Sequence, residues 1–265
     1  MAQRITVVDA FTEKVFAGNP AAVCVLETPR DDTWMQNLAR EMNLSETAFL
    51  VEQTDGWSLR WFTPTAEVEL CGHATLASSH HLWESGRLSP ESAVRFHTLS
   101  GILAAKKHGN WIEMDFPATP ALPAVAPEVL IRALGVTPKS VGKTKFDFLV
   151  ELQNEAAVRA LSPDFQLLKK LSQRGCIVTA PASESGEFDF VSRYFAPAYG
   201  IDEDPVTGSA HCALGPYWAD RFDTKELVGF QASARGGIVR MRIDGERVAL
   251  SGRAVTVLQG ELVGA

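Results

Sequence analysis

The sequence predicts an α+β fold built from two similar units. Predicted strands outnumber predicted helices and do not alternate with them one for one, which is typical of mostly antiparallel sheets. One long motif occurs twice, and a proline-rich stretch separates its two copies. A self-match of this length is typical of a duplicated structural unit. The chain has 265 residues, which is enough for two units that each have a core.

The repeated motif joins an extended segment to the start of a helix. The first copy reads Arg-Trp-Phe-Thr-Pro at 60–64 and Cys-Gly-His-Ala-Thr at 71–75. The second copy reads Arg-Tyr-Phe-Ala-Pro at 193–197 and Thr-Gly-Ser-Ala-His at 207–211. In each copy an acidic stretch separates the two parts. The offset grows from 193 − 60 = 133 to 208 − 72 = 136, so the second copy holds three additional residues.

The first copy belongs to a unit in which short strands accompany two helices. Asp31 is typical of a residue that caps a helix, and Trp34, Leu38 and Met42 follow on one helical face at four-residue spacing. A second helix is predicted over 72–85. The predicted strands of this unit lie at residues 4–11, 21–26, 46–52, 57–63, 93–98, 101–106 and 111–116.

A change of composition marks the boundary between the units. Four prolines fall within residues 117–127, which predicts an irregular linker. Beyond it, helices are predicted at 128–134, 154–161, 165–171 and 208–220, and strands at 146–152, 176–180, 188–195 and within 229–259. We therefore predict a first unit at 1–117, a linker at 118–127 and a second unit at 128–265, whose last strand is able to pack back on the first. Each unit is expected to be a mostly antiparallel sheet curled about one long helix.

The composition is that of a soluble globular protein and argues against several classes of partner. Apolar residues make up 46% of the chain, charged residues 22%, and the net charge is −7. Lysine and arginine form no block, which argues against a nucleic-acid or membrane-surface partner. The sequence begins with a strand-like segment rather than a signal peptide, and no apolar run has the length of a membrane span. Four cysteines without a Cys-x-x-Cys pair suit buried thiols in a reducing compartment, so we expect a cytoplasmic protein.

Gly72 and Gly208 open equivalent helices after extended segments. The first backbone N–H groups of a helix have no partner inside it, and the helix dipole is positive at that end. One such turn is usually no more than the start of a helix. Two of them in matched units predict opposed helix starts that bind one small anion across a cleft. A carboxylate or an enolate-like intermediate is the kind of group that such starts would bind.

Glu46 is the first candidate for proton transfer. In the predicted strand it shares one face with Ala48 and Leu50, and the other face is also apolar. Apolar surroundings raise the pKa of a carboxyl group toward the range that suits proton transfer at neutral pH. The alternative is an acid at a strand end that reaches solvent, and for Glu46 taken alone this is the more common case.

His73 and Ser209 follow the two glycines at equivalent positions, so both side chains are able to point into the same cleft. The alternative makes Ser209 a helix cap and His73 a packed or exposed residue. Asp204 precedes Pro205, and this favours an extended backbone that aims the Asp204 side chain away from the helix axis.

The acidic stretches have a simpler interpretation as well. A solvated loop is the alternative for every acid in them, and we expect it for Glu67, Asp202 and Glu203.

Three other chemistries lack a matching pattern. Cys71, His73, His80 and His81 have no familiar zinc spacing, and His80 lies about two helical turns from His73. Ser209 lacks the Gly-x-Ser-x-Gly frame of a serine hydrolase. A dinucleotide fingerprint and a phosphate-binding loop are also missing. We therefore expect no metal and no cofactor.

Several segments, taken together, match a known family. They are Val-Asp-Ala-Phe at 8–11, Gly-Asn-Pro-Ala-Ala-Val at 18–23, Asn-Leu-Ser-Glu-Thr-Ala-Phe at 43–49, Cys-Gly-His-Ala-Thr at 71–75 and Asp-Pro-Val-Thr-Gly-Ser-Ala-His at 204–211. In this order they resemble the PhzF-like family of phenazine-biosynthesis isomerases, which are relatives of diaminopimelate epimerase. The resemblance covers nearly the whole chain.

The resemblance carries expectations about fold, activity and site. It implies two pseudo-symmetric domains with the active site between them, a homodimer, and cofactor-free movement of a proton on a small anionic metabolite such as a dihydro-hydroxyanthranilate. It implies that Glu46 is the general acid/base and that Asp204 and His73 bind substrate and assist proton movement. Substrate binding is implied for the remaining site residues, which are Ser45, Gly72, Gly208 and Ser209.

One departure from the epimerase relatives bears on the reaction. Those enzymes use a thiol at each of the two turns, whereas this chain has Cys71 at the first and Thr207 at the second, and threonine supplies no thiolate. Cys212 lies inside the helix and does not replace the missing thiol. The sequence therefore predicts a cofactor-independent isomerase. Two alternatives stay open: an amino-acid racemase or epimerase with Asp204 or His73 as second acid/base, and a binding protein on the same scaffold.

Overall fold

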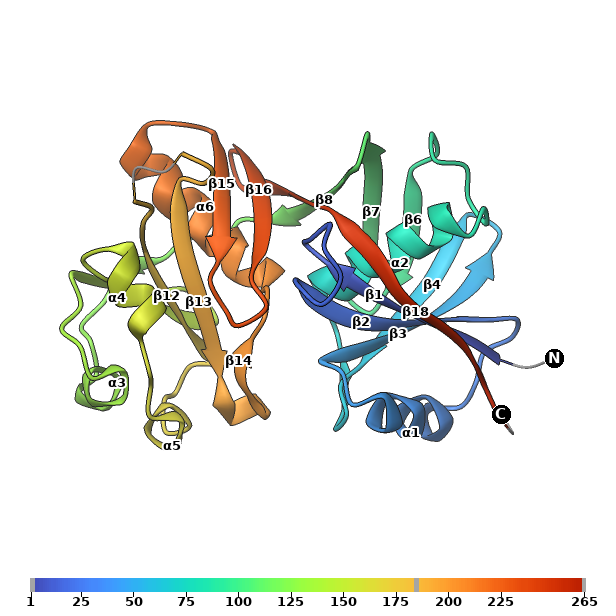
Figure 1. Cartoon of the computed structure of the whole chain (residues 1–265), viewed down its shortest axis with the longest axis horizontal. Coiled ribbons are helices and arrows are strands. Elements are labelled where there is room, and N and C mark those ends of the chain that lie inside the picture. Colours follow the sequence, from blue (N-terminus) through green and yellow to red (C-terminus); the bar gives the residue numbers. More distant parts are fainter. Residues whose placement is uncertain (1–2, 184–185, 264–265) are drawn as a thin grey trace. The chain divides into compact units, whose positions relative to one another are not determined.

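The computed structural model describes residues 3–183 and 186–263, which form two compact units (Figure 1). The first unit holds the chain up to Asp115 together with the segment from Ser251 onward, and the second unit is Phe116–Leu250. In Figure 1 the first unit runs from blue to green and includes the dark red C-terminal segment.

Strands outnumber helices in the first unit. In chain order its elements are β1 (Gln3–Ala10), β2 (Asn19–Leu26), α1 (Asp32–Met42), β3 (Glu46–Gln53), β4 (Gly56–Phe62), β5 (Glu67–Val68), α2 (Gly72–Glu84), β6 (Val94–Thr98), β7 (Gly101–His108), β8 (Trp111–Pro117) and, at the end of the chain, β18 (Ala254–Leu262).

The second unit has a similar order of elements. They are β9 (Leu122–Pro123), α3 (Glu128–Leu134), β10 (Ser140–Lys143), β11 (Asp147–Glu151), α4 (Glu155–Ala160), α5 (Phe165–Leu168), β12 (Gly175–Pro181), β13 (Phe190–Ala196), a 3₁₀ turn (Pro197–Tyr199), β14 (Ile201–Asp204), α6 (Gly208–Phe222), β15 (Glu226–Gln231), β16 (Gly237–Asp244) and β17 (Arg247–Gly252). Within the described ranges, no helix combines the length and the apolar character that crossing a bilayer requires.

The two units repeat one pattern of strand pairing. In the first unit β1–β2 is antiparallel, β2–β3 parallel, β3–β4 and β4–β5 antiparallel, β4–β6 parallel and β6–β7 antiparallel. The second unit shows the same series for β10–β11, β11–β12, β12–β13, β13–β14, β13–β15 and β15–β16. The predicted α+β fold of two pseudo-symmetric units is therefore confirmed.

The chain passes from one unit to the other twice, and each passage is followed by an equivalent pairing. After the first unit the chain forms β9, which pairs antiparallel with β10. After the second unit it forms β18, which pairs antiparallel with β1. The residues predicted as an irregular linker, 118–127, thus contain a short strand of the second unit, and the last strand lies in the first unit.

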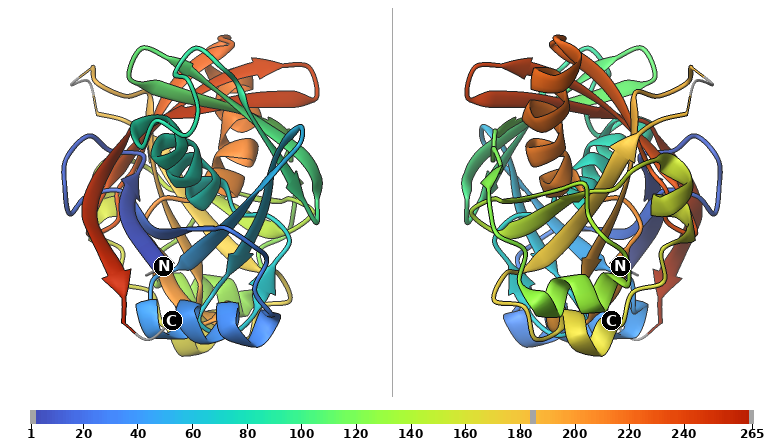
Figure 2. Two further views of the ribbon diagram at one scale, coloured as in Figure 1. Left: turned by 90° about the vertical axis from the view of Figure 1, so that its right-hand side faces the viewer. Right: turned by 90° about the vertical axis from the view of Figure 1, so that its left-hand side faces the viewer.

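α2 is buried on nearly all sides, so its polar residues must find partners within the helix. It contacts β1, β2, β3 and β18, and Figure 2 shows α2 (teal) and α6 (orange) each flanked by strands of its own unit. Thr75, Ser78 and Ser79 donate their hydroxyl protons to carbonyl oxygens four residues earlier, at 2.6, 2.7 and 2.8 Å. These bonds allow small polar residues to lie among apolar neighbours.

α6 depends on a residue of the proline-rich segment. Pro216 lies inside this helix and has no N–H to donate to the Cys212 carbonyl group four residues earlier. The Thr119 N–H donates to that carbonyl oxygen instead, at 3.0 Å. The segment that was predicted to be irregular therefore satisfies an acceptor that the helix leaves open.

α1 covers a core cluster of the first unit with the face that the sequence predicts. Trp34, Leu38 and Met42 all contact this cluster. At its centre, the Phe49 ring lies 6.1 Å from the Trp34 ring and 5.6 Å from the Phe62 ring, both edge to face. The predicted helix and its apolar face are confirmed.

Each of the four cysteines is buried and has a reduced thiol that forms no disulfide. Burial raises the pKa of the Cys24 thiol to about 12 and raises that of Cys176 as well. The expectation that these two cysteines act as small apolar residues of the core is therefore confirmed.

An ion pair is duplicated together with the motif. Arg60 on β4 donates to both carboxylate oxygens of Glu67 on β5, at 2.6 and 2.7 Å. Arg193 on β13 donates to both oxygens of Glu203 on β14, at 2.7 and 2.9 Å. The expectation of solvated loops for Glu67 and Glu203 is wrong, because each motif arginine binds the acid of the short strand that follows it. Asp202, by contrast, is exposed.

We predict that the two motif arginines contribute unequally to stability. Arg193 also donates to the carbonyl oxygens of Val158 and Leu161, at 3.3 and 2.6 Å, and its side chain is 12% exposed against 30% for Arg60. Arg193→Gln leaves a carboxylate and two carbonyl groups without their donor, so it should lower the free energy of unfolding by about 3 kcal/mol. Arg60→Gln should cost about 1 kcal/mol. Urea unfolding followed by circular dichroism measures both losses, and equal losses would contradict the ranking.

Candidate functional site

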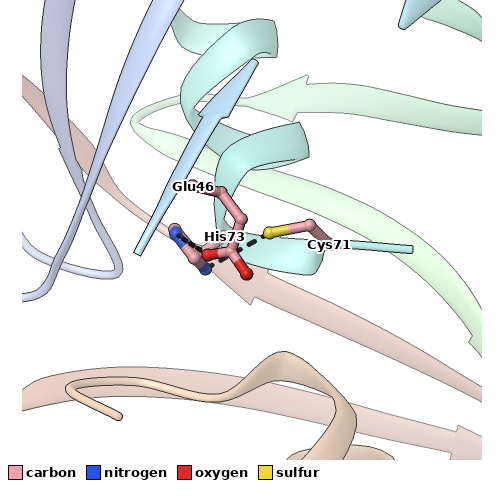
Figure 3. Close-up of side chains that lie close together, drawn as sticks. All are labelled: Glu46, Cys71 and His73. Atoms are coloured by element: carbon pink, nitrogen blue, oxygen red, sulfur yellow. Dashed lines mark hydrogen bonds and ion pairs between the residues drawn. The ribbon is translucent and has the colours of Figure 1, made fainter. Parts of the chain in front are cut away.

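Glu46, Cys71 and His73 come together at the start of α2 in the first unit (Figure 3). Glu46 is the first residue of β3, Cys71 directly precedes α2, and His73 lies in the first turn of that helix. The Glu46 Oε2 atom is 3.3 Å from His73 Nε2, and the Cys71 Sγ atom is 3.5 Å from His73 Nδ1. The side-chain nitrogen of Asn19, at the start of β2, lies 3.3 Å from the same Nδ1 atom.

Burial decides the charge of His73. Its side chain is 7% exposed, and that of Glu46 is 13% exposed. Burial lowers the pKa of His73 from 6.5 to about 3, because the charged ring loses its hydration, so the imidazole is neutral near pH 7. The contact with Glu46 is therefore not an ion pair between two full charges.

The neighbours of the ring favour one of its two neutral forms. The Asn19 amide nitrogen and the Cys71 thiol are both hydrogen-bond donors, and both lie at Nδ1. With these groups donating, Nδ1 accepts and the proton of the neutral ring is on Nε2, which faces the carboxyl group of Glu46. Since Nε2 is 3.3 Å from that group and not aligned for a hydrogen bond, the contact is loose, as catalytic contacts often are before substrate binds.

The strand pattern explains why most of the Glu46 side chain is covered. β3 pairs with β2 on one side and β4 on the other, and its next residues, Thr47, Ala48 and Phe49, are each at most 2% exposed. Both faces of the strand are therefore covered, as its apolar sequence predicts. The alternative of an acid that reaches freely into solvent does not hold for Glu46.

The two motif helices begin without the side-chain caps that other helices of the chain have. Asp31, Asn154 and Asp164 accept hydrogen bonds from the first turns of α1, α4 and α5. For α2 and α6 the residues at the cap position are Cys71 and Thr207, and neither makes a side-chain cap bond within the described residues. α3, which follows a proline, is uncapped too. Uncapped N–H groups of a first turn are suited to bind an anion.

Asp204 is buried beside the start of α6. Its residue is 8% exposed, and its carboxylate accepts the hydroxyl proton of Thr207. The fully buried Gln231 fixes this loop: its amide nitrogen donates to the Asp204 carbonyl oxygen at 2.8 Å, and its amide oxygen accepts from the Thr207 N–H at 2.9 Å. A solvated loop, the alternative for this acid, is therefore wrong for Asp204.

Ser209 is not a helix cap, because Thr207 holds that position. The Ser209 Oγ atom accepts a hydrogen bond from Arg174 Nη2 at 3.1 Å. Arg174 in turn donates to both carboxylate oxygens of Asp147, at 3.1 and 2.6 Å, and the Tyr194 hydroxyl donates to Asp147 at 3.0 Å.

The cluster of Asp147, Arg174 and Tyr194 was missed by the sequence analysis. Tyr194 belongs to the repeated motif, which was the one available signal. Asp147 and Arg174 are 27 residues apart and lie at the starts of two different strands, so only the parallel pairing of β11 with β12 brings them together.

Strand register identifies the equivalent residues of the two units. β3 pairs with β4 in the first unit, and β12 pairs with β13 in the second. The two registers can be aligned by placing the phenylalanine of one motif copy on that of the other. This alignment makes Glu46 equivalent to Gly175 and Ser45 equivalent to Arg174. The second unit therefore has no acid at the place of Glu46.

The predicted site residues thus fall into two groups. Ser45, Glu46, Gly72 and His73 lie together at the start of α2 in the first unit. The other group, at the start of α6 in the second unit, consists of Asp204, Gly208 and Ser209.

Comparison with known proteins decides the family. The model of the PhzC/PhzF family, described as phenazine biosynthesis-like protein, matches residues 8–260. The chain belongs to this family. A protein of Halalkalibacterium halodurans that is named an uncharacterized isomerase is 55% identical to it over 99% of both chains.

Solved structures of the PhzF family share the fold. A PhzF-family protein from Enterococcus faecalis matches with a TM-score of 0.95 and 40% identity, over 99% of this chain and 100% of the other. A predicted epimerase from Pseudomonas aeruginosa matches with a TM-score of 0.77 over 100% of both chains, and its 21% identity shows a common fold alone. The resemblance stated from the sequence segments is therefore confirmed.

Among the residues that the structure describes, this PhzF-family chain also offers a set of donor atoms for a metal. Ligand atoms of Glu46, Cys71 and His73 lie within 4.8 Å of one another, and their oxygen, sulfur and nitrogen donors are of the kinds that zinc accepts. The sequence analysis considered Cys71 and His73 together with His80 and His81. In the structure Cys71 and His73 lie beside Glu46 instead. His80 contacts Glu84 and Thr256.

We predict that buried histidines make the protein less stable in mild acid. Burial lowers the pKa of His73 to about 3 and that of His211 to about 4, against 6.5 for both in an unfolded chain. Below about pH 6.5 the unfolded chain therefore binds protons that the folded chain excludes, and the free energy of unfolding falls as pH falls. The loss should approach about 1.4 kcal/mol per pH unit for each histidine, down to its folded pKa.

Urea unfolding at a series of pH values between neutral and mildly acidic measures this slope. His211→Gln, which can still donate to the Thr207 carbonyl group, should reduce the slope, while His108→Gln, at an exposed position, should leave it unchanged. An unchanged slope in the His211 variant would contradict the assignment.

Proposed function

We propose that this PhzF-family protein is a cofactor-independent isomerase that moves a proton on a small carboxylic acid, with Glu46 as the general acid/base. The observation that carries the proposal is the buried contact between the Glu46 carboxyl group and a neutral His73 ring at an uncapped helix start. The name isomerase given to its relatives agrees with this reaction class.

The proposed reaction uses Glu46 twice. Its carboxylate takes a proton from a carbon next to an unsaturated or carbonyl-like group, and the electron pair of that C–H bond moves into the conjugated system. The protonated Glu46 then returns the proton to another carbon of the same molecule, so a double bond moves and no atom is lost. A Nε2–H of His73 that faces the carboxylate stabilises it between turnovers.

The helix starts are proposed to bind the substrate. N–H groups at Gly72 and Gly208 suit a carboxylate and the charge that develops in the conjugated system. Ser45 and Ser209 are proposed to donate hydroxyl hydrogen bonds to the substrate. The buried Asp204 is proposed to bind a polar group of the substrate and to assist proton movement.

The residues at equivalent positions of the two units favour isomerisation over epimerisation. Epimerisation needs a second acid/base that acts on the opposite face of the carbon atom. In the second unit Gly175 is equivalent to Glu46, Ser209 to His73, and Thr207 to Cys71, and none of the three is an acid/base at neutral pH. Asp204 is the group on which an epimerase mechanism would have to rely.

The substrate is proposed to be a small anionic metabolite of the dihydro-hydroxyanthranilate type. The homodimer, the cytoplasmic location and the independence from any cofactor stay predictions.

A Glu46→Gln variant tests the acid/base role. Gln has nearly the same shape but neither accepts nor releases a proton at neutral pH, so ligand binding should stay within a few fold while turnover falls by about 10²- to 10⁴-fold. Glu52→Gln on the same strand is the matched control, since Glu52 is exposed, and it should keep full turnover. The readout is NMR detection of solvent deuterium that enters a panel of small amino and hydroxy acids, including the dihydro-hydroxyanthranilate. Full exchange by the Glu46 variant would reject the role.

The same deuterium experiment separates isomerisation from epimerisation. An isomerase moves a double bond, so we expect label at a carbon that carried no exchangeable proton in the starting acid. An epimerase places label at one carbon and inverts its configuration. Inversion without movement of a double bond would favour Asp204 as a second acid/base, and tight binding with no exchange at all would favour a binding protein.

A further inference from the structure

We propose that Arg174 positions Ser209 for recognition of a carboxylate, so that these two residues and the first turn of α6 form an anion-binding arm in the second unit. The inference rests on the proposed function, since it assigns the group that binds the anionic end of the same substrate.

The hydrogen bond between these residues orients the serine hydroxyl. Arg174 Nη2 has two N–H bonds: one donates to Asp147 Oδ2 at 2.6 Å and the other to Ser209 Oγ at 3.1 Å. Because Ser209 Oγ accepts from a guanidinium group, its own hydrogen points elsewhere and is able to donate to a ligand. This donor lies in the first turn of α6, beside N–H groups that no side chain caps within the described residues.

Arg174 is held rigidly in this position. Asp147, whose side chain is 3% exposed, binds it through two hydrogen bonds and also accepts the Tyr194 hydroxyl. The guanidinium carbon lies 5.2 Å from the Phe146 ring centre and 5.8 Å from that of Tyr194. Burial disfavours the charged form of Arg174. The hydrogen bonds to Asp147 and its negative charge outweigh this effect and raise the pKa of the guanidinium group, so Arg174 stays a cation.

The two side chains of the ion pair between Arg174 and Asp147 differ in solvent exposure. The Arg174 side chain is 31% exposed, about ten times as much as that of Asp147. The carboxylate of Asp147 is therefore covered, and it accepts a hydrogen bond from the Tyr194 hydroxyl. The guanidinium group is the partner that reaches Ser209. A carboxylate bound to Ser209 would meet the positive side of the pair.

Comparison of the equivalent positions supports the same assignment. In the first unit Glu46 at the start of β3 contacts His73, the residue after the helix glycine. In the second unit Arg174, immediately before β12, contacts Ser209, which also follows the helix glycine. The carboxyl–imidazole contact of the first unit thus starts from the position of Gly175, and the guanidinium–hydroxyl contact of the second starts one residue earlier, from the position of Ser45.

Gly175 makes this second arrangement possible. It stands at the position of Glu46, and a Cβ atom there would lie 2.5 Å from the Tyr194 hydroxyl oxygen. A side chain at 175 would therefore displace the hydroxyl group that binds Asp147. The second unit thus has a glycine at the place of Glu46 and a fixed cation directly before it.

The test compares two probes of nearly the same shape that differ in the charge and hydrogen-bonding capacity of one group. Anthranilate is a small aromatic carboxylate, and anthranilamide has a neutral amide in its place. The full chain should bind anthranilate about tenfold or more tightly, and Arg174→Gln should remove most of this preference, since a hydrogen-bond network with a charged donor is lost. Arg174→Lys keeps the charge but lacks the planar guanidinium fork that binds both oxygens of Asp147 while it donates to Ser209, so it should give an intermediate preference.

Further variants separate positioning from a general loss of fold. Ser209→Ala should lose the preference for anthranilate as well. Combining it with Arg174→Gln should cause little further loss, because both changes remove the same hydrogen-bonded pair. Asp147→Asn combined with Arg174→Gln leaves no buried charge and should keep a native circular dichroism spectrum while losing the preference. Arg159→Gln, at an arginine of the same unit that binds Glu155, is the matched control and should keep it.

The outcomes distinguish this inference from the proposed reaction. Equal affinity of the unchanged protein for the two probes, or an unchanged preference in a folded Arg174→Gln protein, would overturn the anion-binding arm. Glu46→Gln should keep the anthranilate preference. Its effect on deuterium exchange tests proton transfer separately, so either proposal can fail without the other.

Discussion

The contact between Glu46 and His73 is the interaction on which the account of this protein depends. A strand buried on both faces places a carboxyl group against an imidazole ring that burial keeps neutral. Water would ordinarily solvate both groups and hold their pKa values near those of free side chains. The exclusion of that water is the basis of the proposal that Glu46 exchanges a proton with a carbon acid.

The rest of the fold maintains this burial. α2 carries His73 in its first turn and lies among strands on nearly all sides, so its serine and threonine hydroxyl groups donate to its own carbonyl groups rather than to water. α6 has the same place in the second unit and tolerates Pro216 because Thr119 donates to the carbonyl group that the proline leaves open. Both helices keep their first turns uncapped, although aspartate or asparagine caps are used at other helices of the chain.

The sequence was sufficient for the features that depend on nearest neighbours or on the repeat. The capped helix α1 and the two glycine-started helices follow from local spacing, and the duplicated motif predicts the two-unit fold. Partners that only the sheet brings together could not be predicted. Glu67 and Glu203 were expected to lie in solvated loops and instead bind Arg60 and Arg193, because strand pairing folds each acidic stretch back on the motif strand. Arg174 and Asp147 were missed because only the parallel pairing of two strands makes them neighbours.

The most direct measurement of the central claim is ¹⁵N NMR of histidine-labelled protein, with the His73 signals assigned by their loss in a His73→Gln variant. The ring nitrogens report charge and tautomer together. The account predicts that His73 is neutral from neutral pH down to about pH 5, with its proton on Nε2. A His73 ring that gains a second proton near pH 6.5, or a neutral ring with its proton on Nδ1, would contradict it.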